Sequence, residues 1–215
     1  MKLKWLGHSS FLITSETGLR IITDPYTPGD DLRYSPVTEA ADIVIISHDH
    51  FDHNNISSVT GKPEVVTGSG AKSIKGIQFN GIPTYHDRSQ GKERGANTIF
   101  CFPVDGIKLC HLGDLGHKLS QEQVTEVGKV DILLIPVGGF FTIDAGVASQ
   151  VCDDLKPKVI VPMHYKTPKC DFPITGVADF IKGKENVKKL DSSEVEFKSG
   201  ELPETTETIV LKPAL

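Results

Sequence analysis

Short segments in which apolar residues prevail lie between polar and turn residues along the first third of the chain, a pattern that predicts β-strands. The segments are Lys2–Leu6, Ser10–Thr14, Leu19–Thr23 and the apolar run Asp42–Ser47. Gly18 lies between the second and third segments, so the pattern predicts a hairpin turn there. Shorter segments of the same kind predict strands at Glu64–Thr67, Gly76–Ile82, Thr98–Pro103 and Ile107–Leu112. The first half is therefore expected to consist of strands, apart from a short helix over 54–60.

The second half of the chain alternates between helical and extended patterns. The expected elements are helices over 120–128, 144–156 and 174–183, and buried strands over 131–138 and 158–165. Ser120 lies three residues before Gln123, which is a capping-box pattern for the first of these helices. Two late segments, Glu194–Phe197 and Glu207–Leu211, are expected to pair with each other. Strands followed by alternating strands and helices predict a layered α/β protein with helices outside its sheets.

Length, charge and hydropathy set the broad class. The 215 residues contain no internal repeat and no linker rich in Pro, Gly or Ser, so we expect a single domain over residues 1–215. The net charge of −5 argues against a nucleic-acid partner. No apolar run approaches the roughly 18 residues of a membrane-spanning helix, and the first residues lack the pattern of a signal peptide. We therefore expect a cytoplasmic protein without a membrane segment.

The four cysteines contain no C-x-x-C pair, so a thiolate zinc site is not expected. Asp105-Gly106 has the sequence of a two-residue hairpin turn, and counting outward from it pairs Cys101 with Cys110. A cross-strand disulfide is one interpretation of this register. Two free, packed thiols are the interpretation that agrees with a reducing cytoplasm.

The segment ISHDHFDHN, residues 46–54, places three histidines and two aspartates within six positions, directly after an apolar run. In an extended chain, residues two apart share a face, so His48 and His50 point the same way. The loop thus offers two imidazoles to one metal ion. It offers the Asp52 carboxylate and the His53 imidazole to a second. We interpret the segment as part of a metal site.

Three more residues with metal-binding side chains follow segments that are expected to be strands. They are His86, Asp114 and His164. Glycines flank Asp114 and allow another part of the backbone to approach it closely. Each residue alone is compatible with a structural role, but strands that end at one edge of a sheet bring together the residues that follow them. Imidazole and carboxylate ligands suit zinc, and also manganese, iron or nickel.

In their order along the chain, these residues resemble the five-motif signature of the metallo-β-lactamase superfamily. The segments that carry the resemblance are WLGHSSFLI, ITDPY, SHDHFDH, GANTIFCF, HLGDLG, IPVGGFFTIDAGVA and VPMHY. Within the superfamily the chain is most similar to small stand-alone metal-dependent hydrolases, which are relatives of the L-ascorbate-6-phosphate lactonase group. The resemblance implies a four-layer αββα sandwich, in which two mixed sheets face each other, helices lie outside and the metals lie at one edge.

The resemblance also implies two divalent metal ions, with zinc as the expected metal, and assigns their ligands. The implied ligands are His48, His50 and His86 for one ion and Asp52, His53 and His164 for the other, with Asp114 bridging the two. The implied reaction is hydrolysis of a small-molecule ester, lactone, thioester or phosphodiester by a hydroxide shared between the ions. Asp52, Asp114 and His8 are the residues expected to take part in catalysis.

Two other functions are compatible with parts of the sequence. One is a non-catalytic metal-binding protein. The usual sign of such a protein is the loss of some metal ligands, and in this chain the set is complete. A nucleic-acid phosphodiesterase is the other, but the chain is acidic and has no insertion like the additional arm of RNA-processing relatives. Oxygen-reducing di-iron members typically carry Glu and Asp at the positions of His50 and His53, so this chain departs from them. We expect a small-molecule substrate. The sequence leaves open whether the chain forms a homo-oligomer.

Several residues near the motifs have two interpretations. His8 is either a structural histidine or, by the resemblance, a residue beside the metals. Asp24 either forms a turn before Pro25 or orients a ligand histidine.

Arg88, Lys92 and Arg94 lie on a loop that either receives an anionic substrate group or is only solvated. Phe140 and Phe141 either form a wall over the metals or pack in the core, and His117 is a candidate for substrate contact. Asp49 is expected to point away from the metals, and His111 to be packed.

Overall fold

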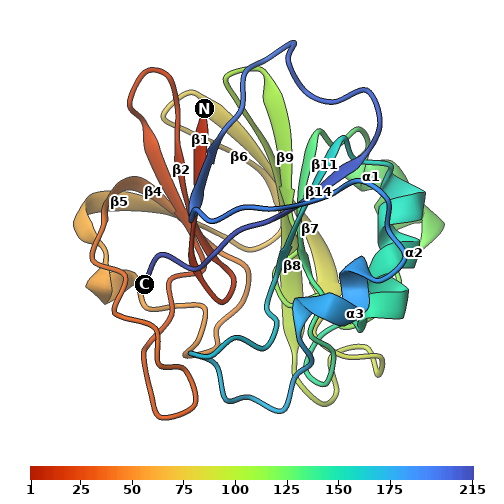
Figure 1. Ribbon diagram of the computed structural model, residues 1–215. Helices are drawn as coiled ribbons and strands as arrows, with labels where there is room; N and C mark the ends of the chain where they lie inside the picture. The colour runs from red at the N-terminus through yellow and green to blue at the C-terminus, as the bar shows by residue number, and fades with distance from the viewer.

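Two β-sheets pack face to face in the computed structural model, which describes residues 1–215 (Figure 1). The first sheet has the strand order β13 (Glu194–Glu196), β1 (Lys2–Gly7), β2 (Ser10–Thr14), β3 (Arg20–Thr23), β4 (Ala40–Ile46) and β5 (Thr60–Thr67). The second has the order β12 (Val187–Lys189), β14 (Glu207–Val210), β11 (Val159–Met163), β10 (Ile132–Pro136), β9 (Ile107–His111), β8 (Ala96–Val104), β7 (Ile77–Tyr85) and β6 (Gly70–Ile74). Each sheet contains parallel and antiparallel pairs, which confirms the expected sandwich of two mixed sheets.

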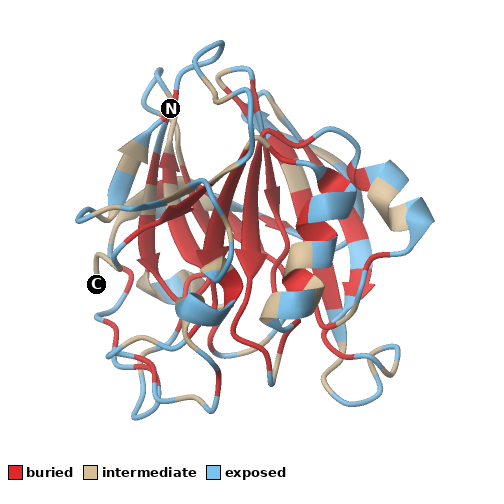
Figure 2. Cartoon of the chain, turned by 45° about the vertical axis from the view of Figure 1, so that its right-hand side comes forward, coloured by how far each residue is buried: buried red, intermediate tan, exposed pale blue.

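The main hydrophobic core fills the space between the sheets. In β4, Ile43 and Ile45 belong to this core, whereas Val44 and Ile46 belong to a second cluster on the outer face of the first sheet. This alternation follows from the two-residue period of a strand. The central strands are buried along most of their length (Figure 2). Burial on both faces explains why the first sheet contains unbroken apolar runs such as Ile43–Ile46.

The helices α1 (Gln121–Val127), α2 (Ala145–Leu155) and α3 (Val177–Ile181) cover the outer face of the second sheet (Figure 1). The capping box of α1 is present, because the Ser120 hydroxyl accepts the Gln123 backbone N–H and the Gln123 side chain accepts the Ser120 N–H. Helix α2 connects the parallel strands β10 and β11. None of the helices combines the length and the apolarity that crossing a membrane requires.

Irregular chain covers the outer face of the first sheet. Residues 24–39 run across it and bury Tyr26 and Tyr34, whose ring centroids lie 5.5 Å apart, against Val44 and its neighbours. The prediction of a short helix over 54–60 is wrong, because only a 3-10 turn, Ile56–Ser58, forms there. Its first residue has no side-chain cap, and the chain passes directly into β5 at Thr60, so no room remains for a full helix.

The expected pairing of the last two strands is also wrong. Strand β13 pairs with β1 at the edge of the first sheet, whereas β14 lies between β12 and β11 in the second. The two segments thus belong to different sheets, and each finds its partners far away in sequence. Strands β6 and β12 were not predicted, because their sequences are short and polar. The Lys75-Gly76 turn between β6 and β7, with φ of 49° and 81°, is a signal that could have revealed the first of them.

The hairpin of β8 and β9 has the predicted register. Asp105 and Gly106 both have positive φ, as a type I′ turn requires, and Cys101 lies directly opposite Cys110. Their Sγ atoms are 3.4 Å apart, and both thiols are free. The hairpin holds β9 in place, so the residues that follow it lie at a fixed point of the sheet edge.

Candidate metal centre

Six strands that run in the same direction end at one edge of the sandwich. They are β1, β3 and β4 in the first sheet and β7, β9 and β11 in the second. Each is followed within three residues by a polar side chain, and these are His8, Asp24, His48, His86, Asp114 and His164. Parallel alignment of strands therefore gathers residues from distant parts of the chain, as the sequence predicted.

Three of these residues have a backbone conformation that non-glycine residues rarely adopt. The φ angles are 51° at His8, 39° at Asp24 and 49° at His164, all in the left-handed region. Such a conformation costs on the order of 1 kcal/mol per residue, which surrounding contacts must offset. Strain of this kind clusters at functional sites, so it supports a functional role for this edge.

The carboxylate of Asp114 lies at the centre of the cluster. Its Oδ2 atom is 3.1 Å from Nε2 of His86 and 3.2 Å from Nε2 of both His53 and His164. All four side chains are almost completely buried. The Asp114 backbone N–H donates to Oδ1 of buried Asn97 at 2.9 Å, which fixes the loop that carries the carboxylate. One oxygen atom thus faces three imidazoles from three different loops.

The ligand-type atoms form overlapping groups in which all members lie within 4.8 Å of one another. The groups are His48, His50 and His86; His8, Asp52, His53 and His164; and His48, His53 and Asp114. The first two groups correspond to the two sets of ligands expected from the sequence, with His8 added to the second. The third places Asp114 beside one member of each, His48 and His53.

Hydrogen bonds fix the tautomer of His53 and His48. Nδ1 of His53 donates to Oδ2 of Asp24 at 3.0 Å, which turns Nε2 toward Asp114. The Ser47 hydroxyl has a single proton and donates it to Asp24 at 2.7 Å. It must therefore accept from Nδ1 of His48, at 2.9 Å, so Nε2 of His48 carries a lone pair, which faces Nδ1 of His50 at 3.1 Å. Asp24 thus contacts His53 directly and His48 through Ser47, as a residue that orients the histidines of the motif would.

His86 is fixed in the same way by a backbone group. Its Nδ1 lies 3.1 Å from the carbonyl oxygen of Phe141, which can only accept, so Nδ1 carries the proton. Nε2 therefore offers its lone pair to the cluster. Three of the imidazoles, on His48, His53 and His86, thus have a partner for Nδ1 and turn Nε2 inward, which is the orientation in which an imidazole binds a divalent metal once Nε2 has lost its proton.

The charges of the cluster favour a cation at its centre. Burial and the charge of His53 lower the pKa of His48 to about 3, so its imidazole is neutral at pH 7. Burial opposes protonation of His53, but Asp114 and Asp52 outweigh it and raise the pKa of His53 well above its usual range. Burial likewise disfavours the Asp114 carboxylate, but His164 and His53 hold its pKa well below the usual range. Positive charge beside Asp114 is thus strongly stabilised.

The residues fit a pair of divalent metal ions. Oδ1 of Asp114 and Nε2 of His53 are buried and have no partner with hydrogen-bond geometry, which is costly for polar atoms unless something else binds them. Imidazoles and carboxylates are the ligands of zinc, manganese, iron and nickel sites. Inward lone pairs around a central carboxylate provide the donors that such ions require.

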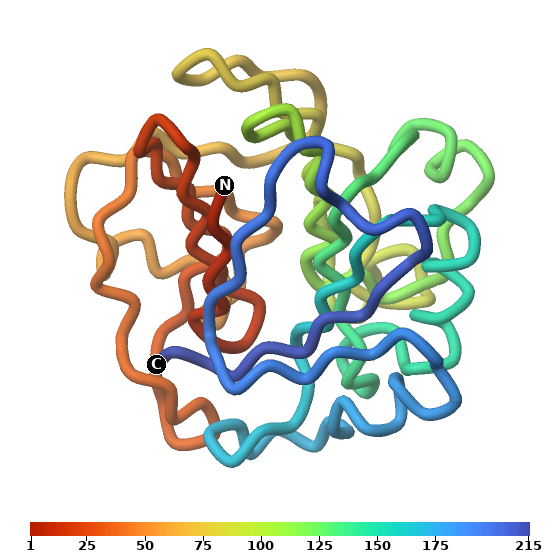
Figure 3. The backbone as a smooth tube through the Cα atoms, turned by 45° about the horizontal axis from the view of Figure 1, so that its top comes forward, coloured from red at the N-terminus to blue at the C-terminus, as the bar shows by residue number.

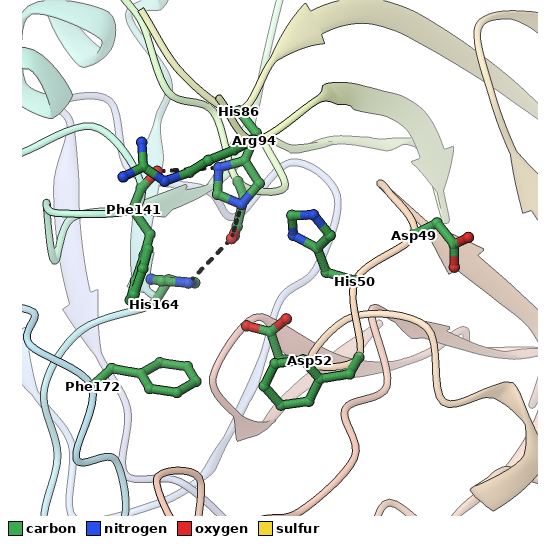
Figure 4. Close-up of a pocket in the computed structure, with 10 residues that line it drawn as sticks. Asp49, His50, Asp52, His86, Arg94, Phe141, His164 and Phe172 are labelled. Carbon is green, nitrogen blue, oxygen red and sulfur yellow. Dashed lines mark hydrogen bonds and ion pairs between the residues drawn. The ribbon is translucent and has the colours of Figure 1, made fainter. Parts of the chain in front are cut away.

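A cavity of about 440 Å³ opens over the cluster (Figure 4). Its lining residues are Asp49, His50, Phe51, Asp52, His86, Arg94, Asp114, Phe141, His164 and Phe172. Figure 4 shows His50, His86, His164 and Asp52 around its centre, whereas Asp49 points away. Asp49 instead accepts a hydrogen bond from Asn54, as its expected outward orientation requires. The size is that of a site for a small molecule.

His8 lies behind the cavity. Its Nε2 is 3.2 Å from Oδ2 of Asp52, and its ring lies 4.1 Å from that of His164. The side chain is buried and does not line the cavity. Burial and the charge of His164 lower the pKa of His8 to about 4. His8 thus contacts Asp52 and does not line the cavity, and the catalytic role expected for it stays a prediction.

Other candidates from the sequence fall outside the cavity. His111 donates from Nε2 to the Ser9 carbonyl and accepts from Gly113 at Nδ1, so it is the packed histidine that we expected. His117 accepts the Tyr85 N–H, and its Nδ1 faces the Lys118 carbonyl, so both ring nitrogens have partners. Arg88 and Phe140 point elsewhere, because Arg88 pairs with Asp144 and Phe140 is 64% exposed.

Two glycines allow the loops of the site to meet. A Cβ atom at Gly116 would overlap the backbone of His86 and Asp87. A Cβ atom at Gly113 would overlap the side chains of Asn97 and Ser47. The close approach expected from the glycines around Asp114 is therefore confirmed.

Sequence reasoning missed four residues of the site. Ser47 and Asn97 hold ligand loops in place, and Phe51 and Phe172 line the cavity. Phe51 lies inside the histidine motif, so its position was a usable signal. Phe172 comes from a loop more than 100 residues later, and nothing in its local sequence marks it.

Comparison with known proteins gives one consistent result. A family model described as beta-lactamase superfamily domain matches residues 2–164. A UPF0173 metal-dependent hydrolase of Archaeoglobus fulgidus is 29% identical over an alignment 233 positions long. The alignment covers 94% of this chain and 97% of that protein. Another, from Nanoarchaeum equitans, is 32% identical and covers 78% of this chain and 85% of the relative. The names of these relatives give an activity, metal-dependent hydrolysis, but no substrate.

Solved structures agree with the sequence relatives. A Thermotoga maritima protein proposed to be a Zn-dependent hydrolase of the metallo-β-lactamase superfamily is 38% identical, with a TM-score of 0.81. The match covers 98% of this chain and 97% of that one. A metal-dependent hydrolase proposed from Parabacteroides distasonis has a TM-score of 0.63 at 19% identity, which is a likeness of fold alone.

Proposed function

Because this chain belongs to the metallo-β-lactamase superfamily and its relatives are metal-dependent hydrolases, we propose that it hydrolyses a small molecule with two divalent metal ions. Zinc is the proposed metal, with manganese, iron and nickel as alternatives. The observation that carries the proposal is the position of Asp114, whose Oδ2 lies within 3.2 Å of imidazoles from both ligand groups. A single carboxylate between two groups of imidazoles suits a pair of ions better than one.

The proposed ligands follow the two groups of the site. They are His48, His50 and His86 for one ion, Asp52, His53 and His164 for the other, and Asp114 between them. When bound, two such ions lower the pKa of a water molecule toward 7 and polarise the bond that the water attacks.

The residues of the chain orient these groups and control protons. Asp24 keeps the proton of His53 on Nδ1, and Ser47 keeps that of His48 on Nδ1. His8 faces Oδ2 of Asp52 and limits the rotation of that carboxylate. Because both Asp24 and His8 are fully buried, these contacts exclude water from the rear of the site.

The proposed substrate is a small ester, lactone, thioester or phosphodiester. A cavity of about 440 Å³ with three aromatic side chains in its lining favours a small molecule with an apolar part. A nucleic-acid phosphodiesterase is less well supported, because the chain has a net charge of −5 and Arg94 is the only Lys or Arg in the lining. We place the reaction in the cytoplasm, with which four free cysteines agree.

Metal analysis and a hydrolysis screen test the proposal. Protein purified without chelators is expected to contain about two ions per chain by elemental analysis. It is expected to hydrolyse at least one class among 4-nitrophenyl esters, lactones, thioesters and bis(4-nitrophenyl) phosphate. Chelation should abolish the activity, and reconstitution with zinc, manganese, iron(II) or nickel should show which ion restores it.

Matched histidine variants complete the test. His53→Ala should lose metal and activity, whereas His117→Ala, on a histidine whose contacts lie outside the cavity, should keep both. A protein that takes up no metal under any of these conditions would refute the proposal. A protein that binds two ions but hydrolyses none of the probe classes would reduce it to metal binding alone.

A further inference from the structure

Arg94 is a cation at the wall of the cavity that no carboxylate of the cavity neutralises. Its guanidinium lies over the ring of Phe141, with Cζ 5.7 Å from the ring centroid (Figure 4). The three lining carboxylates have other partners: Asp49 accepts from Asn54, Asp52 faces His8, and Asp114 faces three imidazoles. The guanidinium therefore keeps its donors for another acceptor.

The nearest acid to Arg94 is a weak competitor. Oε2 of Glu93 lies 3.6 Å from Nη1 of Arg94, and the Glu93 side chain is 59% exposed. The other carboxylate oxygen of Glu93 accepts the Ser89 hydroxyl at 2.6 Å. An exposed pair at this distance contributes little and is screened by salt. A substrate anion that makes two parallel hydrogen bonds to the guanidinium would replace it.

The loop that carries Arg94 is held in one conformation. Asp87 follows His86, and its carboxylate accepts four backbone N–H groups at 2.7 to 3.0 Å. One of the four belongs to Arg94 itself, at 2.8 Å. The Arg94 side chain thus extends from a backbone that is fixed relative to His86, a proposed metal ligand. Such preorganisation reduces the entropy lost on binding.

Aromatic side chains surround the rest of the cavity mouth. Phe141 and Phe172 meet edge to face with ring centroids 5.7 Å apart, and Phe51 is 62% exposed. A lining that combines aromatic side chains with a few polar groups is typical of a small-molecule site. Together with one cation, they complement a molecule that has an apolar body and an anionic end.

From this placement we propose that Arg94 binds a carboxylate or phosphate group of the substrate, while the apolar body of the substrate packs on Phe141 and Phe172. The inference rests on the proposed hydrolase function and narrows its substrate to a small amphipathic anion. Arginine suits this role because its planar fork matches the two oxygens of a carboxylate or phosphate and also stacks on an aromatic ring.

Paired ester probes test the inference. Metal-loaded protein is expected to hydrolyse mono-4-nitrophenyl glutarate with a kcat/KM about 10- to 100-fold above that for the neutral 4-nitrophenyl valerate, as a charged hydrogen bond would give. Arg94→Met should erase the preference by raising the KM for the anionic ester. Arg94→Lys should keep part of the preference for the anionic ester. Lys92→Met removes a charge from the same loop outside the cavity and should keep all of it. A preference that survives in Arg94→Met would overturn the inference.

A binding measurement separates this inference from the hydrolase proposal. Should the metal-loaded protein hydrolyse no probe, calorimetry with 3-phenylpropionate, 3-phenylpropanamide and phenethyl phosphate still tests Arg94. Wild-type protein is expected to bind an anion at least tenfold more tightly than the amide, and Arg94→Met should lose that advantage while Lys92→Met keeps it. The two anions show whether a carboxylate or a phosphate fits better. Equal anion binding by Arg94→Met and Lys92→Met would mean that Arg94 has no such role.

Discussion

Oδ2 of Asp24 lies 3.0 Å from Nδ1 of His53, and both side chains are completely buried. The two residues are 29 positions apart and follow two parallel strands of the first sheet. The same carboxylate accepts the backbone N–H and the hydroxyl of Ser47. Asp24 therefore connects the loop of the histidine motif to the end of β3.

Replacing Asp24 by Asn should weaken metal binding. Asn tolerates the left-handed backbone at this position, so the fold should persist. The neutral amide stabilises the Nδ1–H of His53 less than a carboxylate, and loss of such a contact typically costs 10- to 100-fold in metal affinity. Competition with a chromophoric chelator measures the affinity. Asp153→Asn, at an exposed site on α2, is the control and should bind metal like the wild type.

Asp114→Asn should be the most damaging conservative change among the metal ligands. The variant keeps the size of the side chain but removes the charge that faces His53, His86 and His164. Two neighbouring cations need that charge to offset their repulsion. Elemental analysis should show fewer than two ions per chain, and hydrolysis at neutral pH should fall by about 10²-fold or more. Asp30→Asn, at an exposed position, is the surface control and should keep both ions. Two tightly bound ions in Asp114→Asn would contradict the central role of this carboxylate.

Gly116→Ala should disturb the site through the backbone. A Cβ atom at Gly116 would overlap the backbone of His86 and Asp87, so the β7 loop would have to move. We expect a loss of about 1–3 kcal/mol in the free energy of unfolding, as for overpacked positions, together with weaker metal binding. Denaturant titration and metal analysis measure the two effects. Gly29→Ala, where the added Cβ meets nothing within 4 Å, should change neither.

Cys101 should react first among the four thiols. It is the only cysteine that is not buried. Burial raises the pKa of Cys152 to about 12, and burial together with Cys101 raises the pKa of Cys110. A raised pKa means less thiolate at pH 8, so these thiols should label slowly in the native state, and faster as pH rises. Labelling with Ellman's reagent followed by peptide mapping measures the order, and Cys101→Ser should remove the fast phase.

Asp87→Ala should loosen the loop that carries Arg94. The change leaves four backbone N–H groups without their acceptor, at about 1 kcal/mol each. Trypsin cleaves after Arg88, Lys92 and Arg94, so limited proteolysis reports on the loop directly. Cleavage should accelerate at least tenfold in Asp87→Ala. Glu93→Ala, which removes a side-chain contact of the same loop, should change the rate far less.

The sequence by itself determined the local parts of this protein. Short apolar segments marked most strands, the capping box marked α1, and Asp105-Gly106 set the register that places Cys101 opposite Cys110. The ligand candidates could be recognised because each follows a strand, and strand ends are visible in a single stretch of sequence. These features depend on interactions between residues that are close along the chain.

Only the tertiary structure decided which distant groups meet. β13 and β14 entered different sheets, and His8 came to face Asp52 from 44 positions away. Arg94 lies over Phe141, and Phe172 joins the same cavity from a third loop. Strand order and side-chain packing set these contacts, and both depend on burial of the whole apolar surface. Local propensity cannot specify them, because each of these segments would be equally well formed beside another partner.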